Sequence, residues 1–172
     1  MILWFTGLPG SGKSTLAQGL ESRLKQLGTP CYVLDGDVIR KGLSVDLGFS
    51  PEDRTENIRR IGEVAALFAD AGFVAITAFI SPYRADRARA RAAGGSAFHE
   101  IYIKAPVEVC ESRDPKGHYR KARAGEIAEF TGVSAPYEAP QTADLVIETD
   151  KLSIEESLAK LMDFVRARLT AG

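Results

Sequence analysis

The chain has 172 residues, of which 45% are hydrophobic and 26% charged, and its formal net charge is −1. This length predicts a single domain over residues 1–172, and the near-neutral charge excludes a whole-chain attraction to nucleic acid or to a membrane surface. No apolar run in the sequence approaches the roughly 18 residues of a membrane span.

Apolar runs and amphipathic stretches alternate along the chain, which predicts a parallel sheet with helices on both faces. The apolar start, residues 1–5, lacks a basic flank, so we interpret it as the first strand and not as a signal peptide. Strands are expected at 2–6, 31–34, 73–80, 98–103 and 145–147. Helices are expected at 13–27, 51–71, 81–94, 107–113 and from 153 onward, and the stretch 38–49 is polar and Gly-punctuated.

Three serines mark expected helix starts. Ser50 and Ser81 each precede a proline, and Ser153 opens a capping box. Of the arginines that follow Ser81, we expect Arg87, Arg89 and Arg91 to be solvated. The two cysteines, Cys31 and Cys110, form no metal or disulfide framework, which is typical of buried thiols in a reducing cytoplasm.

A phosphate-binding motif, G-x-x-x-x-G-K-[ST], lies between the first strand and the first helix. Its glycines let backbone N–H groups point at phosphate oxygens, Lys13 can reach the β- and γ-phosphates, and Ser14 can ligate Mg²⁺. The following helix places its positive dipole end under the phosphates. This context predicts nucleotide binding by the P-loop. Its residues are Gly7, Leu8, Pro9, Gly10, Ser11, Gly12, Lys13, Ser14 and Thr15.

Two carboxylates, Asp35 and Asp37, follow the second strand. Parallel strands present their carboxyl ends to the ligand crevice, so these side chains are expected beside the P-loop. They could orient a Mg²⁺-bound water or accept a proton from an acceptor hydroxyl; alternatively, the Asp-Gly-Asp sequence is only a turn. The third strand ends in 78–81 without an acid and no guanine-reading segment is found, which both disfavour a GTPase switch.

The segment from about 114 to 140 is basic at first and then punctuated by glycine and proline, as is typical of a lid. Cations around the predicted crevice suit an anionic acceptor. Aromatic residues in the polar loops could stack on a flat base, or they could form a satellite hydrophobic cluster. The polar groups are Arg40, Arg54, Asn57, Lys116 and the lid cations, and the aromatic residues are Phe49 and Phe130.

Six further segments occur in a characteristic order: Asp35–Asp37, Asp46–Ser50, Arg54–Arg60, Phe79–Arg84, Asp114–Gly117 and Glu129–Gly132. With the P-loop, they make the sequence resemble the adenylyl-sulfate kinase (APS kinase) family up to about Asp150. The resemblance implies an α/β, three-layer P-loop nucleoside-triphosphate-binding fold with a mainly parallel five-stranded sheet and a basic lid. It also implies Mg²⁺-dependent transfer of the ATP γ-phosphate to the 3′-hydroxyl of adenylyl sulfate (APS), giving 3′-phosphoadenylyl sulfate (PAPS) and ADP.

The resemblance also implies roles for particular residues. Asp37 matches the base on the 3′-hydroxyl, Asp35 a partner of a Mg²⁺-bound water, and Arg113 the residue that covers the ATP adenine. We expect direct in-line transfer rather than a phosphoserine at Ser81, because such transfer needs only positioning and charge stabilisation. The implied substrate contacts are Asp37, Arg40, Phe49, Arg54, Asn57, Ile80, Ser81, Lys116, Glu129 and Phe130, with the two phenylalanines sandwiching the adenine.

The sequence departs from the family pattern at Pro9 and Ser11, where Ser and Ala are common. The family's N-terminal extension is missing, so we expect weak inhibition by excess APS. The resemblance implies a homodimer that is either free-standing or joined to an ATP sulfurylase, and the thiols indicate a cytoplasmic protein.

Two other functions remain open from the sequence. Another small-molecule P-loop kinase, of gluconate or shikimate type, would leave Phe49 and Phe130 without a base to stack on. A non-catalytic nucleotide sensor would not need Lys13, Asp35 and Asp37 together.

Overall fold

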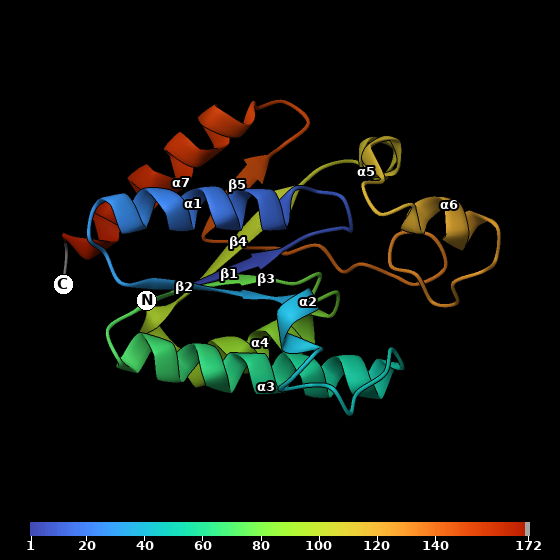
Figure 1. Cartoon of the computed structure of the whole chain (residues 1–172), viewed down its shortest axis with the longest axis horizontal. Helices are drawn as coiled ribbons and strands as arrows, with labels where there is room; N and C mark the ends of the chain where they lie inside the picture. Colours follow the sequence, from blue (N-terminus) through green and yellow to red (C-terminus); the bar gives the residue numbers. More distant parts are fainter. Residues whose placement is uncertain (171–172) are drawn as a thin grey trace.

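A five-stranded parallel sheet lies at the centre of the computed structural model, which describes residues 1–170 (Figure 1). Its strands are β1 (Ile2–Thr6), β2 (Cys31–Asp35), β3 (Val74–Ala78), β4 (Phe98–Lys104) and β5 (Leu145–Glu148). The strand order is β2-β3-β1-β4-β5, and every neighbouring pair is parallel. The predicted fold class, an α/β parallel sheet between helical layers, is therefore confirmed.

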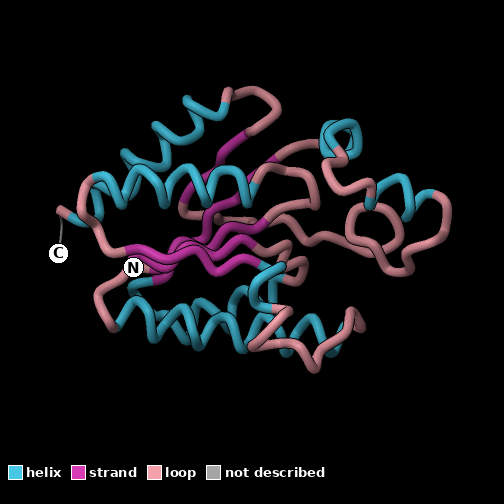
Figure 2. Tube along the Cα trace, in the orientation of Figure 1, coloured by secondary structure: helices cyan, strands magenta, loops and turns pink. Residues whose placement is uncertain are grey.

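Helices cover both faces of this sheet, as Figure 2 shows. They are α1 (Lys13–Gln26), α2 (Gly36–Ile39), α3 (Pro51–Asp70), α4 (Arg84–Gly94), α5 (Val107–Arg113), α6 (His118–Arg123) and α7 (Ile154–Leu169), with a 3₁₀ turn at Gly95–Ala97. Helices α1 and α7 lie on one face, and α3 and α4 lie on the other (Figure 1). None of the helices within residues 1–170 has the length and apolar character needed to cross a membrane.

The central strand, β1, is buried along its whole length because it supplies both layers of the core. Leu3 and Phe5 pack with the α1 and α7 side chains, whereas Ile2 and Trp4 pack with those of α3 and α4. This alternation follows from the two-residue period of a strand. A strand that is buried on both faces holds its carboxyl end rigidly, and the P-loop begins there.

Helix starts agree with the sequence at Ser50 and Ser153 but not at Ser81. The Ser50 hydroxyl accepts a hydrogen bond from the Asp53 N–H, and Ser153 forms the expected capping box. The expectation that Ser81 caps a helix is wrong, since α4 begins at Arg84 after Tyr83. Ser81 instead occupies a buried turn with φ of 41°, after a third strand that is shorter than predicted.

The lid contains more ordered structure than its sequence indicates. Helix α6 lies within it, and a small buried group forms around that helix. We call this group the lid cluster; its buried members are Ala105, Cys110, Tyr119, Ala122 and Phe130. Helices α2, α5 and α6 all lie toward the edge of the sheet where the parallel strands end (Figure 1).

Candidate active site

The P-loop, Gly7–Thr15, runs from β1 into α1. Gly10 has φ of 76°, and a Cβ there would lie 2.8 Å from the Cys110 carbonyl oxygen, so only glycine fits where α5 approaches. Gly12 has φ of 101° and directly precedes α1. The loop therefore keeps its backbone N–H groups at the start of a helix, which is a site suited to phosphate.

Lys13 is buried inside this loop. Its Nζ atom donates hydrogen bonds to the carbonyl oxygens of Gly7 (2.9 Å) and Leu8 (2.7 Å). Burial lowers the Lys13 pKa to about 8, while the nearby Asp35 carboxylate opposes that shift. A partly desolvated ammonium held by carbonyl oxygens is ready to exchange them for phosphate oxygens.

The two predicted carboxylates follow β2 and lie next to the P-loop. Asp35 accepts hydrogen bonds from the Ser14 hydroxyl (2.9 Å) and the Asp37 N–H (3.0 Å), and thereby caps α2. The structure thus joins Ser14, Asp35 and Asp37 in one chain of contacts, although the sequence did not predict α2. Ser14 and Asp35 are oxygen donors of the kind that Mg²⁺ prefers. Within residues 1–170 there is no group of three or more His, Cys, Asp or Glu residues that could hold a metal.

Asp37 points away from that pair and toward the lid. Its Oδ2 atom accepts a hydrogen bond from Lys116 Nζ at 2.7 Å, and both side chains are largely exposed. This hydrogen bond from Lys116 is the main cause of the lowered Asp37 pKa. Asp37 is therefore ionised at neutral pH.

Arg54 connects the two segments that carry the predicted aromatic pair. Its guanidinium donates to the Phe49 carbonyl (2.9 Å), the Glu129 carbonyl (2.7 Å) and the Thr131 hydroxyl (3.0 Å). Glu129 has φ of 52°, so the turn before Phe130 is sharp. Arg54 therefore holds the start of α3 and the lid together.

The two phenylalanines differ in exposure. Phe49 is 65% exposed, and the Arg40 guanidinium carbon lies 4.2 Å from its ring centroid. Phe130 is only 9% exposed and belongs to the lid cluster, where it packs edge-on against Tyr119. The sequence left a satellite cluster as an alternative to base stacking, and for Phe130 the structure shows such a cluster. A base could stack on Phe130 only on a ring face that the lid uncovers when the acceptor binds.

Other predicted acceptor residues lie near the same edge of the sheet. Arg40 also donates to the Gly48 carbonyl oxygen at 2.9 Å. Asn57 is buried in α3, and its Oδ1 atom has no hydrogen-bond partner within the described part of the chain. An unpaired buried amide oxygen is unfavourable, so a ligand donor at this position would stabilise it.

The turn after β3 is tied to the P-loop. The Ile80 carbonyl oxygen accepts hydrogen bonds from the Thr6 hydroxyl (2.7 Å) and the Gly7 N–H (3.5 Å). Ser81 Oγ accepts a hydrogen bond from Trp4 Nε1 at 3.1 Å, which leaves its own proton available for donation. Ile80 and Ser81 therefore lie beside the nucleotide loop.

Thr149, which directly follows β5, joins Arg113 to the P-loop. The Arg113 guanidinium donates to the Thr149 carbonyl (2.6 Å) and hydroxyl (3.1 Å), and that hydroxyl donates to the Ser11 carbonyl (2.8 Å). Thr15 is exposed on the first turn of α1. The predicted nucleotide residues are thus grouped at one edge of the sheet.

Sequence reasoning missed several residues that shape this region. Arg87 was expected to be solvated but is 3% exposed; it donates to the Ser81 and Glu138 carbonyl oxygens, both at 2.7 Å, and pairs with Glu100. Tyr119 is buried and contacts the P-loop. The three-residue spacing of Tyr119 and Ala122 in α6 is a signal that could have revealed a buried helix face.

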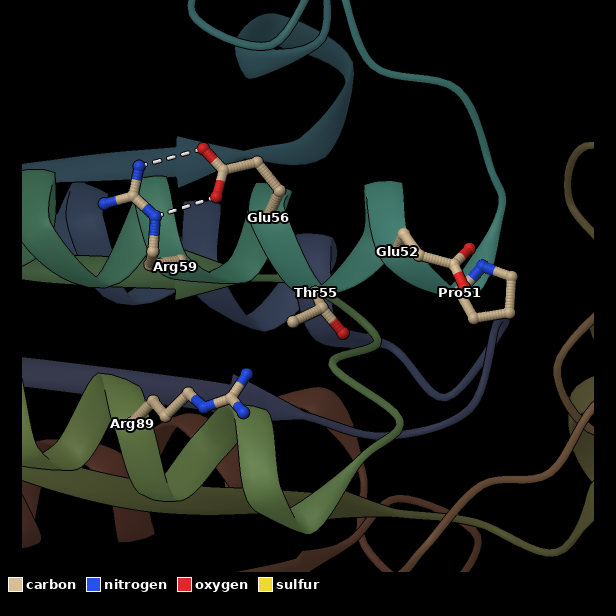
Figure 3. A pocket seen from close by; sticks show the side chains of 6 residues that line it. All are labelled: Pro51, Glu52, Thr55, Glu56, Arg59 and Arg89. Atoms are coloured by element: carbon tan, nitrogen blue, oxygen red, sulfur yellow. Dashed lines mark hydrogen bonds and ion pairs between the residues drawn. The ribbon is translucent and has the colours of Figure 1, made fainter.

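A depression of about 450 Å³ lies elsewhere, between α3 and α4. Figure 3 shows that the Glu56–Arg59 ion pair borders it on α3, with Arg89 facing from α4. Its lining residues are Pro51, Glu52, Thr55, Glu56, Arg59 and Arg89, and none of them is a predicted site residue. The candidate active site is therefore at the carboxyl edge of the sheet and not in this depression.

A P-loop between β1 and α1, a buried Lys13 and an exposed carboxylate after β2 are features of the class of P-loop kinases. The model of the adenylylsulphate kinase family matches residues 1–148. The chain belongs to this family of kinases.

Individual relatives support the same family assignment. The adenylyl-sulfate kinase of Geotalea uraniireducens is 58% identical over 173 residues, covering 100% of this chain and 83% of that protein. That of Paraburkholderia xenovorans is 56% identical, covering 94% of this chain and 90% of its own length. The Mycobacterium tuberculosis APS kinase, solved in complex with AMPPNP and APS, is 46% identical with a TM-score of 0.92, and 96% of each chain is covered.

The alternative function, a P-loop kinase of gluconate or shikimate type, receives no such support. A gluconokinase from Sinorhizobium meliloti is 15% identical with a TM-score of 0.62, over 99% of this chain and 96% of its own. A likeness at that identity shows only the common fold.

Proposed function

We propose that the chain transfers the γ-phosphate of ATP to the 3′-hydroxyl of adenylyl sulfate, which yields PAPS and ADP. One observation carries this proposal within the structure: Asp35 accepts hydrogen bonds from both Ser14 and the Asp37 N–H, at 2.9 and 3.0 Å. This contact supports Asp37 as the base, because it links Asp37 to the phosphate-binding loop through Asp35. Family membership and the relatives named above supply the identity of the acceptor.

In the proposed reaction, Asp37 accepts the proton of the 3′-hydroxyl. The hydroxyl oxygen then forms a bond to the γ-phosphorus, the bond from that phosphorus to the β–γ bridging oxygen breaks, and ADP leaves. Lys116 must first release the Asp37 carboxylate, because its hydrogen bond occupies that carboxylate and lowers the Asp37 pKa, which makes Asp37 a weaker base. An incoming acceptor hydroxyl can replace the Lys116 ammonium at this carboxylate.

The donor side is assigned to the P-loop. Lys13 exchanges the Gly7 and Leu8 carbonyl oxygens for the β- and γ-phosphates, and the loop N–H groups hold the remaining oxygens. Arg113, fixed by Thr149 beside the loop, covers the adenine of ATP. These groups act by position and charge, which are the main contributions that a phosphoryl transfer requires.

Ser14 and Asp35 are the residues that would hold Mg²⁺, the ion we propose as the cofactor. Their oxygen atoms are 2.9 Å apart. Protein Mg²⁺ sites typically combine one or two such ligands with waters and substrate phosphates, so this small donor set fits the ion. When bound, Mg²⁺ neutralises charge on the β- and γ-phosphates.

The acceptor side is assigned to the residues between α2, α3 and the lid. Phe49 and Phe130 stack on the adenine of APS, and Arg40, Arg54 and Asn57 hold its phosphosulfate and ribose region. The unpartnered Asn57 Oδ1 atom supports a ligand donor there. Ile80, Ser81, Lys116 and Glu129 complete the proposed contacts, and the basic residues suit an anionic acceptor.

We further infer a single cytoplasmic domain over residues 1–172 that assembles as a homodimer and that is either free-standing or associated with an ATP sulfurylase. An APS kinase from Thiobacillus denitrificans, 34% identical with a TM-score of 0.74, is hexameric, and this chain covers 29% of that one. Light scattering of the purified protein measures the mass directly, and a monomer would contradict the homodimer.

The function is tested by an ADP-release assay with ATP, Mg²⁺ and a panel of acceptors, namely adenylyl sulfate, gluconate, shikimate and adenosine 5′-monophosphate. We expect turnover with adenylyl sulfate and, for each other acceptor, a rate close to the no-acceptor control. Turnover with gluconate or shikimate but none with adenylyl sulfate would overturn the proposal.

A further inference from the structure

Tyr119 lies in α6 of the lid and contacts both halves of the proposed active site. We propose that Tyr119 is a positioning residue that couples occupation of the P-loop by nucleotide to the affinity for adenylyl sulfate. This inference rests on the proposed function, since it takes Phe130 as the ring that stacks on the acceptor. It concerns a side chain that the transfer reaction itself does not use.

The first contact is with the P-loop. The Tyr119 hydroxyl donates a hydrogen bond to the Pro9 carbonyl oxygen at 2.8 Å, and the side chain is 1% exposed. Burial raises the Tyr119 pKa, so the hydroxyl keeps its proton and remains a donor at any physiological pH. A carbonyl oxygen only accepts hydrogen bonds, so the direction of this bond is fixed.

The second contact is with the acceptor side. The rings of Tyr119 and Phe130 meet edge to face, with centroids 5.0 Å apart and an interplanar angle of 79°. Leu8 of the P-loop packs against the same lid cluster. At Gly132, a Cβ would lie 3.1 Å from a Leu8 methyl carbon, so the backbone after Phe130 also approaches the P-loop closely.

The remaining contacts make Tyr119 a rigid link. The Asp114 carboxylate accepts hydrogen bonds from the backbone N–H groups of Tyr119 (3.0 Å) and Arg120 (3.1 Å), which fixes the start of α6. Arg54 holds the turn before Phe130 through the Glu129 carbonyl. A movement of the Pro9 carbonyl is therefore passed through one buried ring to Phe130.

The sign of the coupling follows from ordering. Nucleotide phosphates fix the P-loop backbone, which fixes the Pro9 carbonyl and with it Tyr119 and Phe130. An acceptor that binds afterward loses less conformational entropy, so it binds more tightly. The same factor must appear in the effect of the acceptor on nucleotide affinity, because coupling between two binding sites is reciprocal.

The test compares the unaltered protein with Tyr119→Phe, which removes only the hydroxyl. Calorimetric titration gives the Kd for adenylyl sulfate in the absence of nucleotide and in the presence of saturating ADP and Mg²⁺, where no phosphate can be transferred. In the unaltered protein, we expect tighter binding with ADP present. In Tyr119→Phe, the ratio of the two Kd values should fall roughly three- to tenfold, the effect of one neutral hydrogen bond. Its affinity for ADP alone should stay within about twofold.

Tyr32→Phe is the matched control, because Tyr32 lies on β2 and stacks on Phe68 outside the proposed site. It should keep the Kd ratio of the unaltered protein. A Tyr119→Phe variant with that same ratio would overturn the inference. Equal losses of affinity for adenylyl sulfate with and without ADP, at an unchanged melting temperature, would overturn it as well. A ratio of one in the unaltered protein would also overturn it. Failure of the proposed function is a separate result, namely no PAPS from ATP and adenylyl sulfate in the unaltered protein.

Discussion

The carboxylate of Asp37 and the ammonium of Lys116 lie 2.7 Å apart and join the end of β2 to the lid. The two residues are 79 positions apart in the chain, and both side chains are largely exposed. An exposed ion pair contributes little to stability, so we expect this pair to act mainly through the pKa of Asp37. It lowers the pKa of the candidate base and occupies its carboxylate until an acceptor displaces the lysine.

Replacing Lys116 by methionine should therefore change the pH dependence of catalysis. The hydrogen bond from Lys116 lowers the Asp37 pKa, so removing it should raise that pKa toward the ordinary aspartate value. Asp37 must be ionised to act as a base, so activity is lost as pH falls through its pKa. The acidic limb of kcat/KM for adenylyl sulfate should move to higher pH in Lys116→Met. An unchanged limb, or one moved to lower pH, would contradict the link.

Lys13 should take up protons when nucleotide binds. Burial lowers its pKa to about 8, so in the free protein a large fraction of Lys13 is unprotonated at pH 8.5. Phosphate charges beside the ammonium favour its protonated form and raise that pKa. Titration of ADP and Mg²⁺ in buffers of different ionisation enthalpy should therefore show proton uptake that increases from pH 7.0 to pH 8.5. Uptake that stays constant over this range would show that the Lys13 pKa is not lowered.

Replacing Arg54 should weaken binding of the acceptor, adenylyl sulfate, and not binding of the donor, ATP. Its three hydrogen bonds join the Phe49 and Phe130 segments, and a lysine cannot reproduce that fork. Arg54→Lys should raise the KM for adenylyl sulfate by about 10- to 100-fold and leave the KM for ATP nearly unchanged. Arg59→Lys is the matched control, since Arg59 is exposed on the same helix and pairs with Glu56. Equal increases in both KM values for Arg54→Lys would mean general distortion.

Arg87 should matter for stability. Its buried guanidinium pairs with Glu100 and donates to the carbonyl oxygens of Ser81 and Glu138. Arg87→Met therefore removes the partner of a largely buried carboxylate and one hydrogen bond from each carbonyl. We expect the free energy of unfolding in urea to fall by about 3–5 kcal/mol. Arg89→Met, two residues further along α4 and largely exposed, should change it by less than about 0.5 kcal/mol. Equal effects of the two substitutions would contradict the assigned role of Arg87.

These residues show where sequence reasoning succeeds and where it stops. Apart from the strand order and the short helices α2 and α6, the fold followed from local signals: alternating elements, the glycines of the P-loop, and the Ser50 and Ser153 caps, whose partners lie three residues away. Asp35 and Asp37 were placed correctly because the carboxyl ends of parallel strands share one edge. Each of these inferences depends on neighbours in the chain or on a general rule of the architecture.

The errors concern contacts between distant segments. Ser81 reads as a helix cap, yet its hydroxyl bonds to Trp4, 77 positions away, and its turn is set by that contact. Arg87 reads as solvated because its partner carbonyl in Glu138 is 51 positions away. The burial of Tyr119 and Phe130 depends on how the lid folds onto the P-loop. Such tertiary partners override what a side chain's type and local pattern indicate.

The assignment of Asp37 as the base that links nucleotide and acceptor is tested most directly by single-turnover PAPS formation with Asp37→Asn, which has the same shape but cannot accept the proton. The unaltered protein should form PAPS, and the variant should lose roughly 10²- to 10⁴-fold in rate while its Kd for ADP and Mg²⁺ stays nearly the same. A variant that forms PAPS at a near-normal rate would contradict the account.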